Sequence, residues 1–383
     1  MTQQSRTGFV WHETFMWHDQ GSYAGVLPPG GYVQPGRHFD TADTKRRFKN
    51  LLDASGLGAA LRPIAPRAAT DEELLRVHSR EYLQRVKDLS AAGGGDAGFF
   101  APIGRGGFEI AARATGGVIS AVEAVVRGEV RNAYALVRPA GHHAEPDLGK
   151  GFCIFGNVAI TARHARTALA IERVAIVDWD VHHGNGAQKI FWTDPTVLTI
   201  SVHQDRSFPP DSGFAHEIGA GAGAGYNINI PLPAGCGHGT YVEAFSRCVL
   251  PALRAFRPGL ILVSCGFDAG AMDPLGRMVL HSETFRQLTA FMMEVADETC
   301  GGRLVLAHEG GYSEPMVPFL GLAVVEQLAG TRSGVEDPFL PIVAADPAHA
   351  VLPHHELAIA QAEIHVRRLA ASVSPTQPTS PSR

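Results

Sequence analysis

Short runs of apolar residues, many of them β-branched, alternate along the chain with longer stretches in which apolar residues recur at helical spacing. Such runs predict strands buried on both faces of a parallel sheet, because they offer no polar side to water. We expect these strands at residues 133–137, 174–177, 197–202, 260–264 and 304–307. Residues 108–127 and 241–256 are typical of helices, and the resulting β-α-β order predicts an α/β fold.

The rest of the chain is predicted to form loops, a terminal helix and a tail. Gly-rich segments at 91–98 and 219–225 are too short to be interdomain linkers, so we interpret them as loops. Residues 357–369 favour a helix. The Ser-, Thr- and Pro-rich segment 372–383 has almost nothing to bury and is predicted to be disordered.

Charge and cysteine content exclude several classes of protein. The 38 acidic and 33 basic residues give a net charge of −5, and no run of Lys or Arg interrupts this balance, so nucleic-acid binding is not supported. The five cysteines form no Cys-x-x-Cys pair, which favours a reducing compartment over a disulfide scaffold. No signal-peptide core is present, and no apolar run approaches the roughly 18 residues needed to span a bilayer. We therefore predict a cytoplasmic protein that binds no membrane.

Titratable residues follow four of the predicted strands at their carboxyl ends, where open parallel sheets bind ligands. Asp180 and His182 follow the strand at 174–177 and are two residues apart, so they project to one side of an extended chain. Asp268 follows the strand at 260–264. One imidazole and two carboxylates suit a divalent ion and leave a position open for water, as in a catalytic zinc site. Taken alone, Asp180 and His182 are equally well explained as a strand-end turn.

The pair His142-His143 weakens that simpler explanation, because adjacent histidines at a buried strand end each need partners for two ring nitrogens. Asp178 is positioned to hold one ring as a charged pair. Asn185 is positioned to orient the other and leave it neutral, and a neutral imidazole is a usable base. Tyr312 follows the strand at 304–307 and is a candidate oxyanion donor, with a packing role as the alternative.

At this level of detail the sequence resembles the zinc-dependent histone deacetylases, and within them the class II-like bacterial histone deacetylase-like amidohydrolases. The motifs occur in family order and cover roughly residues 8–330: Arg138 to Ala144, Gly151 to Phe155, Asp178 to Gly186, Ser207 to Gly213, Val263 to Ala269 and Glu309 to Tyr312. The resemblance implies an open parallel sheet of the arginase/deacetylase type, flanked by helices, with the active site at the strand carboxyl ends. It also implies one catalytic domain over 1–371.

Carried over by position, the resemblance implies that Asp180, His182 and Asp268 bind one Zn²⁺. His143 is then the general base and later the acid, and His142 paired with Asp178 gives electrostatic support. Asn185 stands where class I members have Asp. Tyr312 polarises the substrate carbonyl. The substrate channel involves these residues: Gly151, Phe152, Phe208 and Leu275.

Members of this family also bind one or two structural K⁺ ions, mostly through main-chain carbonyls. The positions that correspond to the first K⁺ site are Asp178, Asp180, His182, Ser201 and Val202. Those that correspond to the second are Phe191, Asp194, Val197 and Tyr226.

The function these features favour is a zinc amidohydrolase that removes acetyl or related acyl groups from acyl-lysine peptides or small acylated amines. Leu275 stands where polyamine-selecting relatives place an acidic residue, which favours acyl-lysine over the alternative of an acetylpolyamine or other small amide. A two-metal ureohydrolase is the second enzyme alternative. Its Asp-x-His-x-Asp segment needs a final Asp, but the segment that begins at Asp180 ends in Gly184, so this sequence lacks one ligand for a second metal. A non-catalytic acyl-lysine-binding protein is the alternative of another class, although no catalytic residue is lost. The oligomeric state, including a homo-oligomer, is left open.

Overall fold

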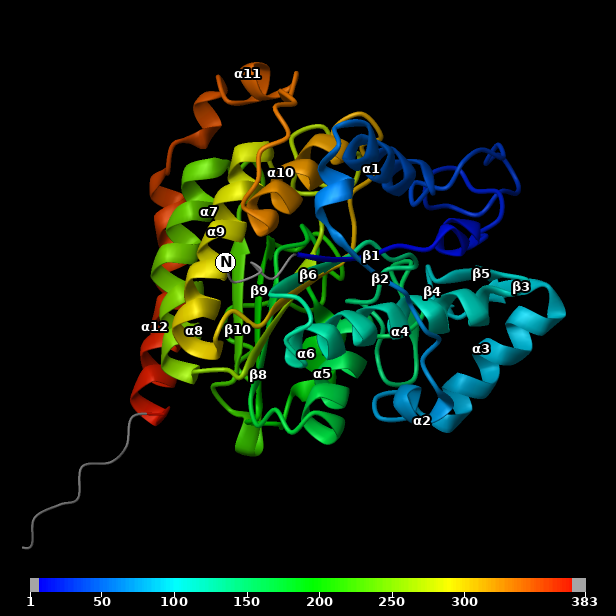
Figure 1. The fold of residues 1–383 in the computed structure, drawn as a ribbon, viewed down its shortest axis with the longest axis horizontal. Coiled ribbons are helices and arrows are strands. Elements are labelled where there is room, and N and C mark those ends of the chain that lie inside the picture. Colours follow the sequence, from blue (N-terminus) through cyan, green and yellow to red (C-terminus); the bar gives the residue numbers. More distant parts are fainter. Residues whose placement is uncertain (1–6, 374–383) are drawn as a thin grey trace, which may run out of the picture.

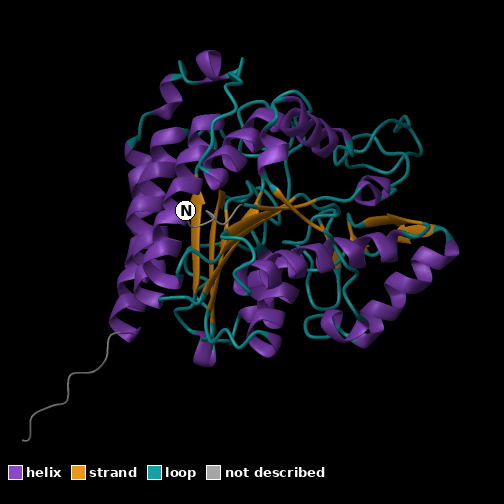
Figure 2. Cartoon of the chain, viewed as in Figure 1, coloured by secondary structure: helices purple, strands orange, loops and turns teal. Residues whose placement is uncertain are grey.

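An eight-stranded parallel sheet forms the centre of the molecule, with helices on both of its faces (Figures 1 and 2). The structure is a computed structural model and describes residues 7–373. The strand order is β10-β9-β8-β11-β12-β6-β1-β2. The strands are β1 (Gly8–Val10), β2 (Arg62–Ile64), β6 (Asn132–Ala135), β8 (Val174–Asp178), β9 (Val197–Gln204), β10 (Asn227–Leu232), β11 (Leu260–Cys265) and β12 (Leu304–His308).

Two layers of helices cover the sheet (Figure 1). One face carries α4 (Gly107–Val126), α5 (Asn157–Ala168) and α6 (Asn185–Phe191). The other face carries α1 (Asp43–Ala54), α7 (His238–Ala244), α8 (Leu250–Phe256), α9 (Ser282–Cys300), α10 (Val317–Ala329) and α12 (Pro353–Val373). This arrangement explains why the central strands read as continuous apolar runs, since neither face meets water.

Strand β8 shows how the two cores form. Ala175 and Val177 pack into the core on the side of α8 and α9, whereas Val174 and Ile176 pack into the core on the side of α4 and α5. Burying each Val or Ile side chain contributes about 1.5–3 kcal/mol, so both faces of the strand stabilise the sheet.

A smaller apolar cluster lies beside the main sheet, around α2 (Asp71–Leu74) and α3 (Arg80–Ala92). An antiparallel pair, β3 (Gly94–Asp96) with β5 (Pro102–Gly104), follows α3. A second pair, β4 (Gly98–Phe99) with β7 (Gly149–Lys150), joins this region to the segment that leads into Phe152. A further short α-helix is α11 (Leu340–Val343).

The predicted fold class and the five predicted strands are confirmed, and several local expectations need correction. Segment 91–98 contains strand β3 and the start of β4, so it is not only loop. Segment 219–225 contains a short 3-10 turn at Gly221–Gly223. The helix predicted at 241–256 is interrupted by a π-helical turn at Phe245–Val249, which separates α7 from α8.

The carboxyl-terminal predictions are tested only in part. Helix α12 contains the predicted helix and reaches two residues into the predicted tail, to Val373, while 374–383 lie outside the described residues. The single-domain assignment over 1–371 remains a prediction. Within the described part of the chain, no helix combines the length and apolar character that a membrane span requires.

Candidate metal centre and active site

The carboxyl ends of four adjacent strands meet at one edge of the sheet. These strands are β8, β11, β12 and β6, in that spatial order. Asp180 and His182 follow β8, Asp268 follows β11, Tyr312 follows β12, and the His pair follows β6. Because parallel strands all end at the same edge, residues separated by more than 100 positions in sequence come together there.

Asp180, His182 and Asp268 form a buried cluster whose ligand atoms lie within 4.8 Å of one another. Nδ1 of His182 is 3.0 Å from Oδ1 of Asp180 and 3.1 Å from Oδ2 of Asp268. The main-chain N–H of Gly310 donates to Asp180 at 2.8 Å, and that of Val181 donates to Asp268 at 2.8 Å. These hydrogen bonds fix each carboxylate through one oxygen and leave the other directed at the imidazole.

The electrostatics of this cluster favour a cation. Burial and the neighbouring Asp180 raise the pKa of Asp268 to about 7. Burial alone would lower the pKa of His182, but hydrogen bonds to Asp180 and Asp268 raise it to about 10. The two carboxylates thus hold a proton on the imidazole at the point where a divalent ion would satisfy all three groups. The donor set fits one Zn²⁺ with a further position open to water or substrate.

Glycine at position 310 permits the close approach of the last strand end to this cluster. A Cβ there would lie 2.1 Å from Oδ2 of Asp268 and 2.6 Å from Oδ2 of Asp180. Any side chain would therefore displace a carboxylate, which explains why a glycine precedes the Gly311-Tyr312 turn.

His142 and His143 lie side by side, with ring centroids 3.9 Å apart, and differ in their partners. Nδ1 of His142 is 2.9 Å from Oδ2 of Asp178, and Nδ1 of His143 is 2.7 Å from Oδ1 of Asn185. Burial opposes a charge on His142, but Asp180 and Asp178 raise its pKa well above the usual value. Burial, His142 and His182 lower the pKa of His143 well below its usual value. The surroundings therefore favour a charge on His142 and disfavour one on His143.

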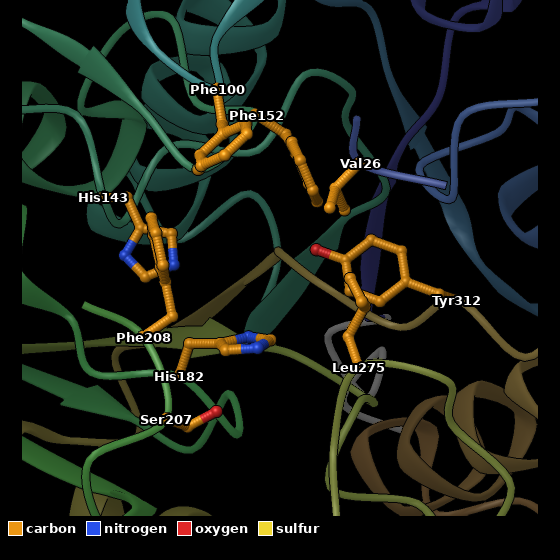
Figure 3. Close-up of a pocket in the computed structure, with 10 residues that line it drawn as sticks. Val26, Phe100, His143, Phe152, His182, Ser207, Phe208, Leu275 and Tyr312 are labelled. Carbon is orange, nitrogen blue, oxygen red and sulfur yellow. The ribbon is translucent and has the colours of Figure 1, made fainter. Parts of the chain in front are cut away.

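A pocket of about 210 Å³ opens at His182, the member of the metal cluster that lines it (Figure 3). Its lining is mainly apolar and consists of Val26, Phe100, His143, Gly151, Phe152, His182, Ser207, Phe208, Leu275 and Tyr312. Figure 3 shows the Tyr312 hydroxyl pointing into the pocket, across from His143. Burial raises the pKa of Tyr312 well above its usual value, so the phenol keeps its proton and can donate a hydrogen bond.

Aromatic contacts hold the pocket walls in place. The ring of Phe152 meets that of Tyr312 edge-on at 5.8 Å, and Phe208 stacks on Phe99 at 6.2 Å. Gly151 has a φ of +51°, and a Cβ at this position would lie 2.4 Å from the His143 ring. The predicted channel residues thus lie together, with Gly151 providing the space that the histidine occupies.

The residues predicted for the first K⁺ lie close to the metal cluster. Asp178 on β8 and Ser201 on β9 are register partners, and Val202 follows Ser201 in the same strand. Oγ of Ser201 accepts from the main-chain N–H of Gly184 at 3.3 Å.

The residues predicted for the second K⁺ lie around the end of α6 and the start of β9. The carbonyl of Phe191 accepts from the N–H of Asp194 at 2.9 Å, and the carbonyl of Tyr226 accepts a hydrogen bond from β9. The Asp194 carboxylate is bound by Arg163 and Thr196. Val197 begins β9. Hydrogen bonds of this kind do not test ion binding, so both potassium sites stay predictions.

Sequence reasoning missed several groups that complete the site. The Asp273 carboxylate accepts from the N–H of Tyr312 at 2.7 Å and from that of Leu275 at 2.8 Å, so one side chain fixes both. The sequence signal that could have identified Asp273 is its place in the Asp-Pro-Leu-Gly segment at 273–276. Val26 comes from an irregular loop, where no periodic pattern could place it at the pocket.

The two-metal ureohydrolase alternative meets a steric obstacle. A Cβ at Gly184 would lie 2.4 Å from Oδ2 of Asp178. A two-metal site would require a carboxylate side chain at position 184. The space for that side chain is already occupied by Asp178, the partner of His142.

Comparisons with known proteins agree with this geometry. Residues 38–328 match the family model of the histone deacetylase domain. The chain is 49% identical to a histone deacetylase-like amidohydrolase of Pseudomonas aeruginosa, over 90% of this chain and 92% of that protein. It is 36% identical to a probable deacetylase of Archaeoglobus fulgidus, over 88% and 90% of the two chains. The solved structure of an HDA15 HD domain is similar with a TM-score of 0.84 and 29% identity, covering 97% of each chain.

Proposed function

Since the chain belongs to the histone deacetylase family and is an amidohydrolase of the deacetylase type, we propose that it hydrolyses the side-chain amide of acetyl-lysine and related acyl-lysines. The products are a carboxylate and a free amine. The reaction takes place in the pocket above Asp180, His182 and Asp268, and the following steps assign a task to each residue.

Asp180, His182 and Asp268 would hold the zinc ion on which this family depends, and the bound ion would supply Lewis-acid polarisation of the amide carbonyl and a lowered pKa of water. The fit rests on the donor set itself: two carboxylates and one imidazole, each oriented by the protein. Other residues of the chain carry the proton transfers and orient the amide.

The two histidines divide the proton transfers. His143 is neutral because burial and the nearby histidines lower its pKa, so it accepts a proton from the attacking water. His143 then returns that proton to the departing amine. His142 stays charged because it is paired with Asp178, and it stabilises the negative charge that develops on the oxygen of the substrate carbonyl.

Tyr312 donates a hydrogen bond to the same developing oxyanion from across the pocket. Its main chain is held by Asp273 and its ring by Phe152, so the hydroxyl is fixed before the substrate enters. A preorganised donor of this kind binds the carbonyl oxygen more strongly in the transition state than in the bound substrate. That difference lowers the barrier of the chemical step.

The channel selects an uncharged stem. Phe152 and Phe208 line it, and none of the described residues that line it carries a carboxylate, which agrees with the aliphatic chain of an acyl-lysine. Leu275 in the lining offers no charged partner to a second ammonium group, which disfavours acetylpolyamines.

The observation that carries this proposal is the combination around one pocket of a His143 ring held by Asn185, a Tyr312 hydroxyl across from it, and the buried cluster of Asp180, His182 and Asp268. An acyl-lysine-binding protein without activity has no need of the base or of the oxyanion donor. We extend the proposal to one or two K⁺ ions at the positions named above, and to the cytoplasm, where the five unpaired, buried cysteines stay reduced.

The test is a deacylation screen of protein whose metal content has been measured. The substrates are acetyl-lysine peptides, trifluoroacetyl-lysine, acetylspermidine and small amides, and product formation is followed as free amine. We expect acetyl-lysine peptides to be hydrolysed with a higher kcat/KM than acetylspermidine. Binding of acetyl-lysine without hydrolysis of any of these amides, in zinc-loaded protein, would favour the non-catalytic alternative.

A further inference from the structure

We propose that His142, Cys153 and Glu309 form a second metal site, beside the catalytic cluster, that takes a thiophilic divalent ion such as Cd²⁺ or excess Zn²⁺ and inhibits the enzyme. The binding part stands on the geometry alone. The inhibition rests on the function proposed for His142, and the two parts are tested by separate measurements.

The three side chains form a compact and buried set of donors. One ligand atom from each lies within 4.8 Å of the others, and the side chains have 6%, 0% and 1% of their surface exposed. Among the described residues, only this group and the catalytic cluster bring three such donors so close. The catalytic cluster has no sulfur, whereas this one offers sulfur, nitrogen and oxygen, a softer set that suits Zn²⁺ or Cd²⁺.

Each donor is already oriented by a hydrogen bond that leaves another atom or lone pair for a metal. Asp178 holds the His142 ring through Nδ1. The N–H groups of Gly141 and His142 donate to Oε2 of Glu309, at 2.6 and 3.1 Å. The Cys153 thiol donates a weak hydrogen bond to the carbonyl of Gly151, with the sulfur 3.4 Å from the oxygen. Metal ligands in proteins are held in this way by outer partners that fix their direction.

Glu309 provides a second, independent observation that points to a bound ligand. Its Oε1 is buried and has no hydrogen-bond partner among the described residues. A buried carboxylate oxygen without a partner is costly, because burial removes water and nothing replaces it. A cation bound there would satisfy Oε1 while Oε2 kept its two N–H donors.

Binding would follow a simple proton balance without any redox change. The ion displaces a proton from the His142 ring and one from the Cys153 thiol, and both protons go to solvent. Nε2 of His142, which lies 3.8 Å from Oδ1 of Asp180, becomes a metal ligand. His142 then can no longer act as the charged partner of the reaction, so turnover stops while the catalytic ion stays in place.

The test uses the full chain loaded with one equivalent of zinc and titrated with Cd²⁺ in a thiol-free reductant. A thiolate-to-Cd²⁺ absorption band in the near ultraviolet reports on Cys153, since the catalytic ligands include no sulfur. We expect the band to saturate at one Cd²⁺ per chain, with deacetylase activity falling by about tenfold or more over the same range. The band requires no substrate, so it tests the site even if the chain has another activity.

Three variants make the result decisive. Cys153→Ser should lose the band and the additional Cd²⁺, and its activity, relative to its own value without Cd²⁺, should resist inhibition. Glu309→Gln keeps an oxygen for the two N–H groups but loses the charge, so Cd²⁺ should bind about tenfold more weakly. Cys265→Ser, which alters another fully buried cysteine, should behave as the wild type.

Two outcomes would overturn the proposal. Absence of the band in the wild type, or its persistence in Cys153→Ser, would show that these residues bind no such ion. A normal band with unchanged deacetylase activity would leave a metal site that is not inhibitory. If Cys153→Ser does not fold, the Glu309→Gln titration decides, since an unchanged affinity there removes the carboxylate from the site.

Discussion

The pocket has a floor and a wall that are built in different ways. The floor consists of Asp178, Asp180, His182, Asp268 and the two histidines, which follow adjacent strands and are joined by hydrogen bonds. The wall consists of Phe152, Phe208 and Leu275, which come from loops and, for the aromatic pair, are held by ring contacts. We expect the charged floor to determine the reaction, and the apolar wall to determine which acyl chain and amine can reach it.

This difference predicts where a single substitution costs most. Floor groups depend on one another through short distances in a buried, weakly screened environment, so removing one leaves others unsatisfied. Wall groups interact with the substrate through dispersion and burial, which decline gradually with changes of shape. Floor substitutions should therefore abolish metal binding or lower kcat, and wall substitutions should change the ranking of substrates.

The largest effect is expected for Asp180→Ala and Asp268→Ala. Each removes a carboxylate from the three-ligand cluster, so the bound zinc should fall from about one per chain to near zero, and activity with it. Elemental analysis of the purified variants measures this loss. Asp205→Ala, which removes an exposed carboxylate outside the cluster, is the matched control and should keep its metal. Full occupancy in both ligand variants would refute the assignment.

Tyr312→Phe should lower kcat on acetyl-lysine by about 10²–10³, because one oxyanion donor is lost. Metal content and thermal stability should stay close to the wild-type values. The kcat on trifluoroacetyl-lysine should fall less, since the electron-poor carbonyl of this substrate needs less polarisation. Tyr32→Phe, which alters a fully exposed tyrosine, provides the control. Equal kcat for Tyr312→Phe and the wild type on the acetyl substrate would leave the tyrosine with a packing role only.

Asn185→Asp should change the pH dependence. The new carboxylate would face Nδ1 of His143, which is now 2.7 Å from the amide oxygen, and would raise the pKa of that ring. His143 acts as a base only when neutral, so the acid limb of the kcat/KM profile should move to higher pH, by roughly one unit. The variant should lose activity mainly on the acid side. An acid limb that stays in place would mean that another group sets it.

The smallest effect concerns the wall. Leu275→Glu should raise the kcat/KM for acetylspermidine relative to acetyl-lysine by roughly fivefold, the size expected for a half-exposed ion pair worth up to about 1 kcal/mol. Leu275→Gln has nearly the same shape without the charge and should leave the ratio unchanged. The gain should shrink as salt is added, because screening weakens the pair. Equal ratios in the two variants would show that the gatekeeper lies elsewhere.

The same contrast explains what could be predicted from the sequence. Strands β6, β8, β9, β11 and β12 are buried on both faces, so their apolar runs identify them, and the residues at their ends could be placed along one edge. Strands β1 and β2 have only three residues each, too few for a pattern. Strand β10 contains Asn227 and Asn229, whose amides bond to Gln188, so it does not read as an apolar run.

The loops of the site were harder to predict for a physical reason. Phe152 and Phe208 were recognised through the motifs that contain them, but the positions of Val26 and Phe100 depend on irregular backbone. Phe100 adopts a positive φ of 54°, which its sequence context does not signal. Asp273 and Glu309 act through main-chain N–H groups, and contacts of that kind leave no trace in residue spacing.

Removal and restoration of the metal test the central claim, that this floor performs a zinc-dependent amide hydrolysis. Chelated protein should show no hydrolysis of an unactivated acetyl-lysine peptide, and activity should return in proportion to added Zn²⁺ up to one equivalent per chain. Asp268→Ala should not recover under the same treatment. Undiminished hydrolysis by chelated protein with no detectable metal would contradict the account.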